Sequence, residues 1–306
     1  MSKNAKPMTA LDLTECRVLI LGDSITDSGA YVSFLDYALL SLYPDRTTDI
    51  ISAGLSSETA SGLSEPAHPF PRPCVHERLS RALTLVRPDV TIACYGMNDG
   101  IYHPFSEERF SAYKSGMTKL ADAVRNAGSK LLIMTPPPFE AKSISNKVRP
   151  ASYNNFSYLE PYDGYDDVLA RYAAWLMDDT PRGAAVFDLH RAIAGYCEQR
   201  YRNDPHFLFT PDGIHPSDDG HVFMARALLA YLGVDKSPLD APLGETNTRP
   251  LFQKAAARRK LRSLGWQRSI GYTRETRVHE DCINATEAEV LRMTNEIAVL
   301  RALLRQ

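Results

Sequence analysis

Five short runs of apolar residues recur along the chain, and each holds four to seven residues. They do not alternate between apolar and polar positions, as a strand with one face in water would. Continuous apolar runs of this length are typical of strands that are buried on both faces. We therefore predict five buried strands, which cover residues 18–21, 49–52, 89–95, 130–135 and 184–188.

Between these runs, apolar residues recur every three or four positions, as they do on one face of a helix. Pro44, Pro88 and Gly128 end three of the stretches, because proline interrupts a helix and glycine favours its C-terminal cap. Strands that alternate with helices indicate an α/β sandwich around a parallel sheet. The predicted helices cover residues 31–42, 75–86, 110–124, 166–179, 190–201 and 217–232.

The two ends of the chain depart from this pattern. Residues 1–15 have little apolar surface to bury, and we expect a flexible N-terminal arm. The repeating strand–helix unit then occupies residues 16–234 as one domain. Residues 235–250 contain several prolines and predict a linker, which leads into a helical C-terminal extension at 251–306.

The last predicted helix carries an apolar stripe at alternating spacings of three and four. The stripe covers about two heptads, which is shorter than the three or four that indicate a coiled coil. Two interpretations remain open, namely a helix folded back onto the domain and a homodimer contact. The stripe consists of Val290, Met293, Ile297, Leu300 and Leu304.

Composition narrows the classes of partner. A formal net charge of −2 disfavours nucleic acid and anionic membranes as main partners, although residues 254–262 are locally basic. The five cysteines are odd in number and lack CxxC spacing, so they predict neither a disulfide framework nor a zinc site. The first residues are polar and no apolar stretch reaches membrane-spanning length. We expect a cytoplasmic protein.

Two distant segments carry the candidate chemistry. Ser24 follows the first predicted strand, and a tight loop presents Asp212 and His215 three positions apart. A serine hydroxyl is a weak nucleophile at neutral pH and needs a base within hydrogen-bond reach. His215 can accept its proton, and Asp212 can orient the imidazole and stabilise its protonated form.

Ser24, Gly54 and Asn98 each follow a different predicted strand. Taken singly, they resemble a helix N-cap serine, a turn glycine and a turn asparagine. The carboxyl ends of parallel strands meet at one edge of the sheet, where ligands bind. We therefore predict an oxyanion hole made of the Gly54 amide, the Asn98 side chain and the Ser24 amide. One such donor contributes about 3–4 kcal/mol to transition-state stabilisation.

Four motifs together resemble the SGNH (GDSL) hydrolase family, in the family's order, over roughly residues 17–232. They are Gly22-Asp-Ser24-Ile, Gly54, Gly96-Met-Asn98-Asp and Asp212-Gly-Ile-His215-Pro. The second motif lacks the asparagine that often precedes the glycine in this family. The alternative α/β-hydrolase elbow, Gly-x-Ser-x-Gly, is not matched by any serine of this chain.

The resemblance implies a flavodoxin-like, three-layer α/β/α sandwich with a central five-stranded parallel sheet. It also implies Ser24 as nucleophile, His215 as base, Asp212 as its orienting group, and Gly54 and Asn98 as oxyanion donors. Family members hydrolyse esters and thioesters, including acetylated sugars and lysophospholipids, and need neither metal nor cofactor.

No long apolar groove for a fatty chain is visible, which favours short acyl esters on a polar scaffold such as a carbohydrate. Arg72 and His76 follow the Gly54 loop and are predicted to reach the substrate at the rim. A thioesterase or lysophospholipase is the alternative among enzymes. A non-catalytic protein that binds acylated ligands, or a scaffold, is the alternative outside enzymes.

Overall fold

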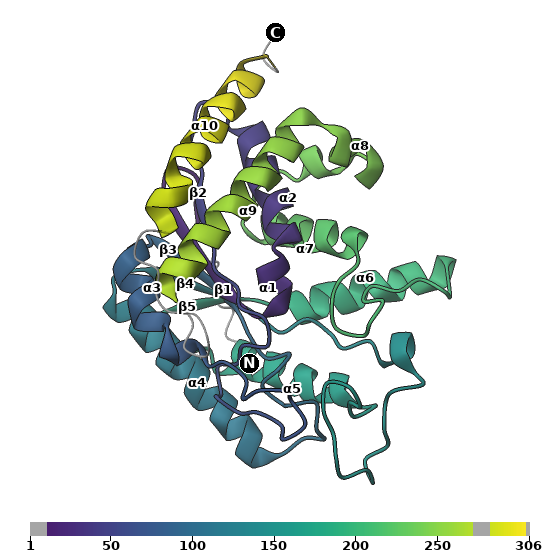
Figure 1. Cartoon of the computed structure of the whole chain (residues 1–306). Helices are drawn as coiled ribbons and strands as arrows, with labels where there is room; N and C mark the ends of the chain where they lie inside the picture. Colours follow the sequence, from purple (N-terminus) through teal and green to yellow (C-terminus); the bar gives the residue numbers. More distant parts are fainter. Residues whose placement is uncertain (1–10, 272–281, 304–306) are drawn as a thin grey trace, which may run out of the picture.

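The computed structural model describes residues 11–271 and 282–303. Its centre is a sheet of five parallel strands in the order β2-β1-β3-β4-β5 (Figure 1). This arrangement confirms the predicted α/β fold. The strands are β1 (Arg17–Gly22), β2 (Asp49–Ser52), β3 (Val90–Cys94), β4 (Lys130–Met134) and β5 (Ala184–Phe187).

Helices cover both faces of the sheet, which explains why the strands are continuously apolar. Along β1, Val18 and Ile20 pack into one hydrophobic cluster, whereas Leu19 and Leu21 pack into another on the opposite face. The first cluster contains side chains of α2, α6 and α7, and the second those of α3, α4 and α5. The bounds are α2 (Ala30–Leu42), α3 (Leu79–Val86), α4 (Glu107–Asn126), α5 (Tyr165–Asp178), α6 (Leu189–Asn203) and α7 (Asp218–Tyr231).

The sheet order places β1 between β2 and β3. The loops that leave the carboxyl ends of these three strands are therefore neighbours, as the sequence predicts for Ser24, Gly54 and Asn98. Short helical segments occur in the connections. They are α1 (Ser24–Ser28), η1 (Val75–Glu77), η2 (Ala141–Ile144), η3 (Ser237–Leu239) and α8 (Leu243–Thr248).

Two predicted boundaries need correction. Leu11 and Leu13 are buried in the core beside α2, so the part of the predicted arm at 11–15 is packed and not flexible. Residues 1–10 lie outside the described part of the chain. The predicted linker at 235–250 contains η3 and α8 and buries Leu239 and Thr246, so it belongs to the packed domain. Both segments bury apolar side chains that local composition alone did not reveal.

The C-terminal extension forms two long helices, α9 (Pro250–Ile270) and α10 (Cys282–Leu303). Leu251 and Ala255 of α9 belong to the first hydrophobic cluster, whereas Trp266 and Ile270 belong to the second. Helix α9 thus crosses from one face of the sheet to the other beside β2, the edge strand (Figure 1). Covering this edge protects strand groups that would otherwise be open to pairing with another chain.

Two arginines of the basic stretch at 254–262 form ion pairs within the fold. The buried Arg258 guanidinium donates to the buried Asp36 carboxylate of α2 at 2.9 Å. Arg262 pairs with Asp49 at the start of β2. A charge pair that is buried between two helices fixes their register, because displacing either partner would leave an uncompensated charge.

Helix α10 packs against α9. Val290 and Ile297 of the predicted stripe are buried, which supports the interpretation of a helix folded back onto the domain. Leu304 lies outside the described residues. A homodimer contact through this helix stays a prediction. Within the described residues, no helix combines the length and apolar character needed to cross a bilayer.

Candidate active site

Folding brings together the three side chains that carry the predicted chemistry. Ser24 begins α1, directly after β1, and its Oγ lies 2.7 Å from Nε2 of His215. Nδ1 of His215 lies 2.7 Å from Oδ2 of Asp212. The two short distances form a continuous hydrogen-bonded path from the serine hydroxyl through the imidazole to the carboxylate. This is the geometry that a serine needs to lose its proton during attack.

The loop between α6 and α7 fixes the Asp212 carboxylate relative to the His215 imidazole. Oδ1 of Asp212 accepts hydrogen bonds from the backbone N–H groups of Ile214 and His215, at 3.0 and 2.7 Å. Gly213 has a φ of +84°, a conformation that glycine adopts without strain. One oxygen of Asp212 therefore organises its own loop while the other faces the imidazole ring.

Glu140 anchors the same loop from outside. Its Oε2 accepts from the backbone N–H and the hydroxyl of Thr210, at 2.7 and 3.0 Å. Its own N–H donates to the carbonyl of Gly213 at 3.0 Å, and its Oε1 accepts from the Tyr201 hydroxyl at 2.6 Å. The sequence analysis missed Glu140, because the long segment 136–165 shows no periodicity that would place it.

The electrostatics match this arrangement. Partial burial raises the pKa of Asp212, but hydrogen bonds from the ring and backbone of His215 and from the backbone of Ile214 outweigh it and lower that pKa to about 2. The hydrogen bond to Asp212 raises the pKa of His215 and outweighs partial burial, which lowers it. Asp23 also raises the pKa of His215 when it is ionised, but burial raises the pKa of Asp23 itself to about 7. Asp212 is thus ionised wherever His215 titrates.

This coupling predicts a pH dependence. His215 accepts a proton only when neutral, and its raised pKa keeps it protonated to higher pH. We expect kcat/KM to fall with decreasing pH, with a midpoint above the ordinary histidine value of 6.5. In an NMR titration of the inactive Ser24→Ala protein, adding Asp212→Asn should lower the His215 midpoint. If Asp212→Asn left the titration midpoint of His215 unchanged, the coupling between Asp212 and His215 would be contradicted.

Asn98 lines the same cavity as Ser24 and His215, and the loop of Gly54, the other predicted oxyanion donor, packs against α1. Asn98 Nδ2 donates to the carbonyl of Glu58 at 3.2 Å, and its Oδ1 accepts from the Tyr102 hydroxyl at 2.9 Å. Tyr102 therefore fixes which way the amide faces, and the second N–H of Nδ2 remains for a ligand. A Cβ on Gly54 would lie 2.2 Å from the Asp27 nitrogen, so only glycine lets this loop approach α1 so closely.

The loop after Asn98 is strained. Ile101 and Tyr102 have φ values of +47° and +61°, a region that branched and bulky residues rarely adopt. The conformation buries the Tyr102 ring beneath the site and aims its hydroxyl at Asn98. Strain of this kind persists when surrounding contacts hold it, and it is common in functional sites. The sequence analysis did not identify Tyr102.

Ser24, Asn98 and His215 line one cavity of about 400 Å³. Its wall combines aromatic rings with polar groups, which suits a ligand that presents both kinds of surface. The side chains that line it include Ser24, His68, Phe70, Arg72, Asn98, Tyr158 and His215.

Arg72 lines this cavity, but its charge is already matched. Its Nε and Nη2 donate to the two oxygens of the buried Glu65 carboxylate, both at 2.6 Å. The bidentate pair stiffens the loop above Ser24. A contact between Arg72 and substrate stays a prediction, and the structure adds that Glu65 holds the guanidinium in place.

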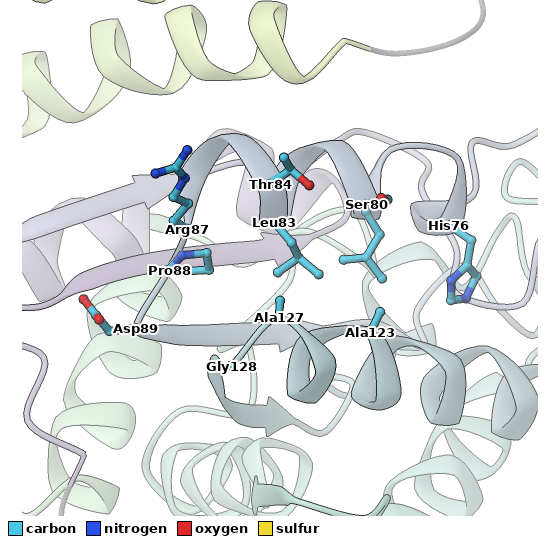
Figure 2. A pocket seen from close by; sticks show the side chains of 11 residues that line it. His76, Ser80, Leu83, Thr84, Arg87, Pro88, Asp89, Ala123, Ala127 and Gly128 are labelled. Carbon is cyan, nitrogen blue, oxygen red and sulfur yellow. The ribbon is translucent and has the colours of Figure 1, made fainter.

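His76 does not reach the site. It lines a separate cavity of about 750 Å³ between α3 and α4. Figure 2 shows His76 at one end of this cavity, Leu83 and Ala127 in the middle, and Asp89 at the other end. The prediction that His76 contacts substrate is therefore wrong. The chain turns after the proline-rich segment 65–73, and it is His68 that lies in the wall beside Ser24.

No three His, Cys, Asp or Glu side chains in the described part of the chain gather into a group that could hold a metal ion.

Comparison with known proteins identifies the family of this chain. The sequence model of the GDSL-like lipase/acylhydrolase family matches residues 20–223. The chain belongs to this family. As a GDSL-like acylhydrolase, the protein is a hydrolase of ester bonds. A comparison with curated proteins found no match.

Solved structures share the fold of this GDSL-like hydrolase at low sequence identity. A gut microbial diltiazem-metabolizing enzyme is 19% identical with a TM-score of 0.59, and the match covers 74% of this chain but only 49% of that one. An acetylxylan esterase from Geobacillus stearothermophilus is 18% identical with a TM-score of 0.53, covering 73% and 96%. A putative GDSL-like lipase from Parabacteroides merdae is 17% identical with a TM-score of 0.50, covering 74% and 100%.

Proposed function

We propose that the protein is a serine esterase that removes short acyl groups, above all acetyl groups, from a carbohydrate. The observation that carries the proposal is the unbroken path from Ser24 Oγ to His215 and Asp212, with 2.7 Å at each step. A binding protein or scaffold has no need of a nucleophile that is hydrogen-bonded to its base. The path therefore favours catalysis over the non-catalytic alternative.

The reaction proceeds through an acyl-enzyme. Ser24 Oγ attacks the ester carbonyl while His215 Nε2 takes the hydroxyl proton. The carbonyl oxygen becomes an oxyanion that accepts hydrogen bonds from the amides of Ser24 and Gly54 and from Asn98 Nδ2. The C–O bond to the alcohol then breaks, and His215 gives its proton to the leaving oxygen.

Water completes the cycle. His215 takes a proton from a water molecule, which attacks the acyl carbonyl and forms a second oxyanion in the same donors. The bond to Ser24 Oγ breaks, the acid leaves, and the proton returns to the serine. Asp212 stays ionised throughout and stabilises the imidazolium in each step, as its pKa of about 2 allows.

The cavity supports a short acyl group and a polar alcohol. At about 400 Å³ it lies at the small end of the usual range for ligand sites, and polar side chains share its wall with Phe70 and Tyr158. Aromatic rings bury the apolar faces of sugars, while neighbouring polar groups bind hydroxyls. Phe70 is 46% exposed, and its ring contacts that of His68.

The Geobacillus acetylxylan esterase adds support. Its catalytic mutants replace a serine, an aspartate and a histidine, and that aspartate precedes that histidine by three positions. Asp212 and His215 have the same separation.

For the cellular compartment we propose the reducing cytoplasm, and the support is that all five cysteines are free thiols.

A substrate screen tests this proposal. We expect the highest kcat/KM for acetyl esters in a p-nitrophenyl series of increasing chain length, and release of acetate from acetylated oligosaccharides. The cavity beside Ser24 is small, so activity should fall as the chain lengthens. A preference for long acyl chains or for thioesters would instead favour a lysophospholipase or a thioesterase.

A further inference from the structure

Helix α9 lies outside the segment that matches the family, yet it contacts the elements that carry the site. Nη2 of Arg259 donates to the carbonyl of Ser28, at the end of the short helix that Ser24 begins, at 3.1 Å. About two turns further along α9, the side chain of Gln267 donates a hydrogen bond to the loop that carries Gly54. The C-terminal extension therefore supports both the nucleophile helix and the predicted oxyanion loop.

The side-chain amide of Gln267 joins these two elements directly. Its Nε2 donates to the carbonyl of Gly54 at 2.6 Å and to Oδ1 of Asp27 in α1 at 2.9 Å. Oδ2 of Asp27 accepts in turn from the hydroxyl of Ser56 at 2.7 Å, and Ser56 lines the cavity. One amide nitrogen thus ties the helix of the nucleophile to the loop of the oxyanion donor.

Both peptide groups that flank Gly54 are held by other residues. In the peptide before it, Arg78 Nη2 donates to the carbonyl of Ala53 at 2.7 Å. The carbonyl and N–H of a trans peptide point in opposite directions, so this bond turns the Gly54 N–H away from Arg78. In the peptide after it, Gln267 binds the carbonyl, and the N–H of Leu55 donates to Gly22 at 2.8 Å.

Gly54 is a buried residue, and no hydrogen bond among residues 11–271 and 282–303 uses its N–H. A buried backbone N–H without a partner is rare and calls for an explanation, and the oxyanion of the proposed mechanism supplies one. Glycine has wide backbone freedom and gives this donor no fixed direction of its own. The contacts of Arg78 and Gln267 supply the direction.

We propose that Gln267 is a positioning residue that orients the Gly54 oxyanion donor, so that the C-terminal extension completes the active site. This inference rests on the proposed esterase mechanism. Gln267 touches no reacting atom and acts through the Gly54 peptide. Arg78 holds the other side of the same glycine, but it also pairs with the buried Glu58, so its replacement would disturb the core as well.

Gln267→Met tests the proposal, because methionine has nearly the same shape and no N–H to donate. We expect kcat for p-nitrophenyl acetate to fall by about 10- to 100-fold, because small misplacements of a donor are costly. KM should change by less than about twofold, because the donor acts on the oxyanion and not on the bound ester. Thermal unfolding should stay near that of the wild type.

A boronic acid inhibitor gives a second measurement that a purely structural role would not move. It adds to Ser24 as a tetrahedral anion, so its Ki should rise by the same factor as kcat falls. Gln253→Met is the matched control. Gln253 lies near the start of α9, at the opposite end from Gln267, and its Nε2 donates to the carbonyl of Asn247. We expect wild-type kcat and Ki from this control.

Unchanged kcat and boronate affinity in Gln267→Met would overturn the inference, and so would equal losses in Gln253→Met. If the methionine variant does not fold, Gln267→Leu also removes the donor without adding a charge beside Asp27 and should show the same loss of kcat. Ser24→Ala separates the two proposals. If Ser24→Ala is inactive while Gln267→Met is normal, only this inference fails, whereas an active Ser24→Ala enzyme removes the esterase mechanism itself.

Discussion

Replacing Ser24 by alanine should lower kcat for p-nitrophenyl acetate by about a million-fold, to the limit of detection. The loss is this large because the acyl-enzyme cannot form without the hydroxyl, and the oxyanion donors alone contribute only a small residual rate. A steady-state assay measures it. A fluorophosphonate probe should label the wild-type protein at Ser24 and leave the variant unlabelled.

Ser28→Ala provides the matched control. Ser28 lies at the other end of the same short helix, and its hydroxyl donates to the carbonyl of Ile25 at 2.9 Å. We expect this variant to retain activity and labelling, since its side chain is not part of the path to His215. Retained turnover in Ser24→Ala would exclude the nucleophile assignment and the mechanism built on it.

The second large effect concerns the oxyanion hole. Asn98→Ala should lower kcat by about 100- to 1,000-fold with little change in KM, because the Nδ2 donor acts on the charge that forms in the transition state. The substitution also leaves the buried Tyr102 hydroxyl without the acceptor it now has, at a cost of about 1–3 kcal/mol in unfolding free energy.

Thermal unfolding separates these two consequences of Asn98→Ala, because the kinetic loss should remain at temperatures where the variant is fully folded. Asn126→Ala, at the exposed end of α4, removes the same amide from the surface and should change neither kcat nor stability appreciably. A variant whose KM rises while kcat is unchanged would show that Asn98 binds the substrate and does not stabilise the oxyanion.

The general architecture could be predicted because it depends on local patterns. Continuous apolar runs predicted strands that are buried on both faces. Apolar residues at helical spacing between these runs predicted the helices that cover the sheet. Given parallel strands, Ser24, Gly54 and Asn98 had to emerge at one edge. The observed order then makes their strands neighbours, with that of Ser24 in the middle.

Residues in irregular segments could not be placed this way. His68 and His76 are eight positions apart in a stretch without periodicity, and the turn between them sends one to the cavity and the other to the groove beside α3. Glu140 and Tyr102 escaped notice for the same reason. Their contacts with the site depend on backbone turns, and a pair of positive φ values at 101 and 102 has no sequence signature in branched and aromatic residues.

Residue types and spacing were sufficient to predict the sheet, the candidate nucleophile and a base with its carboxylate in one loop, because neighbouring residues and the strand period settle those features. The long-range contacts arose only on folding. Ser24 meets His215 across 191 positions, and Gly54 meets Gln267 across 213. Contacts over such separations depend on how whole layers pack, and α9 reaches the loop of Gly54 because it crosses the edge of the sheet at β2.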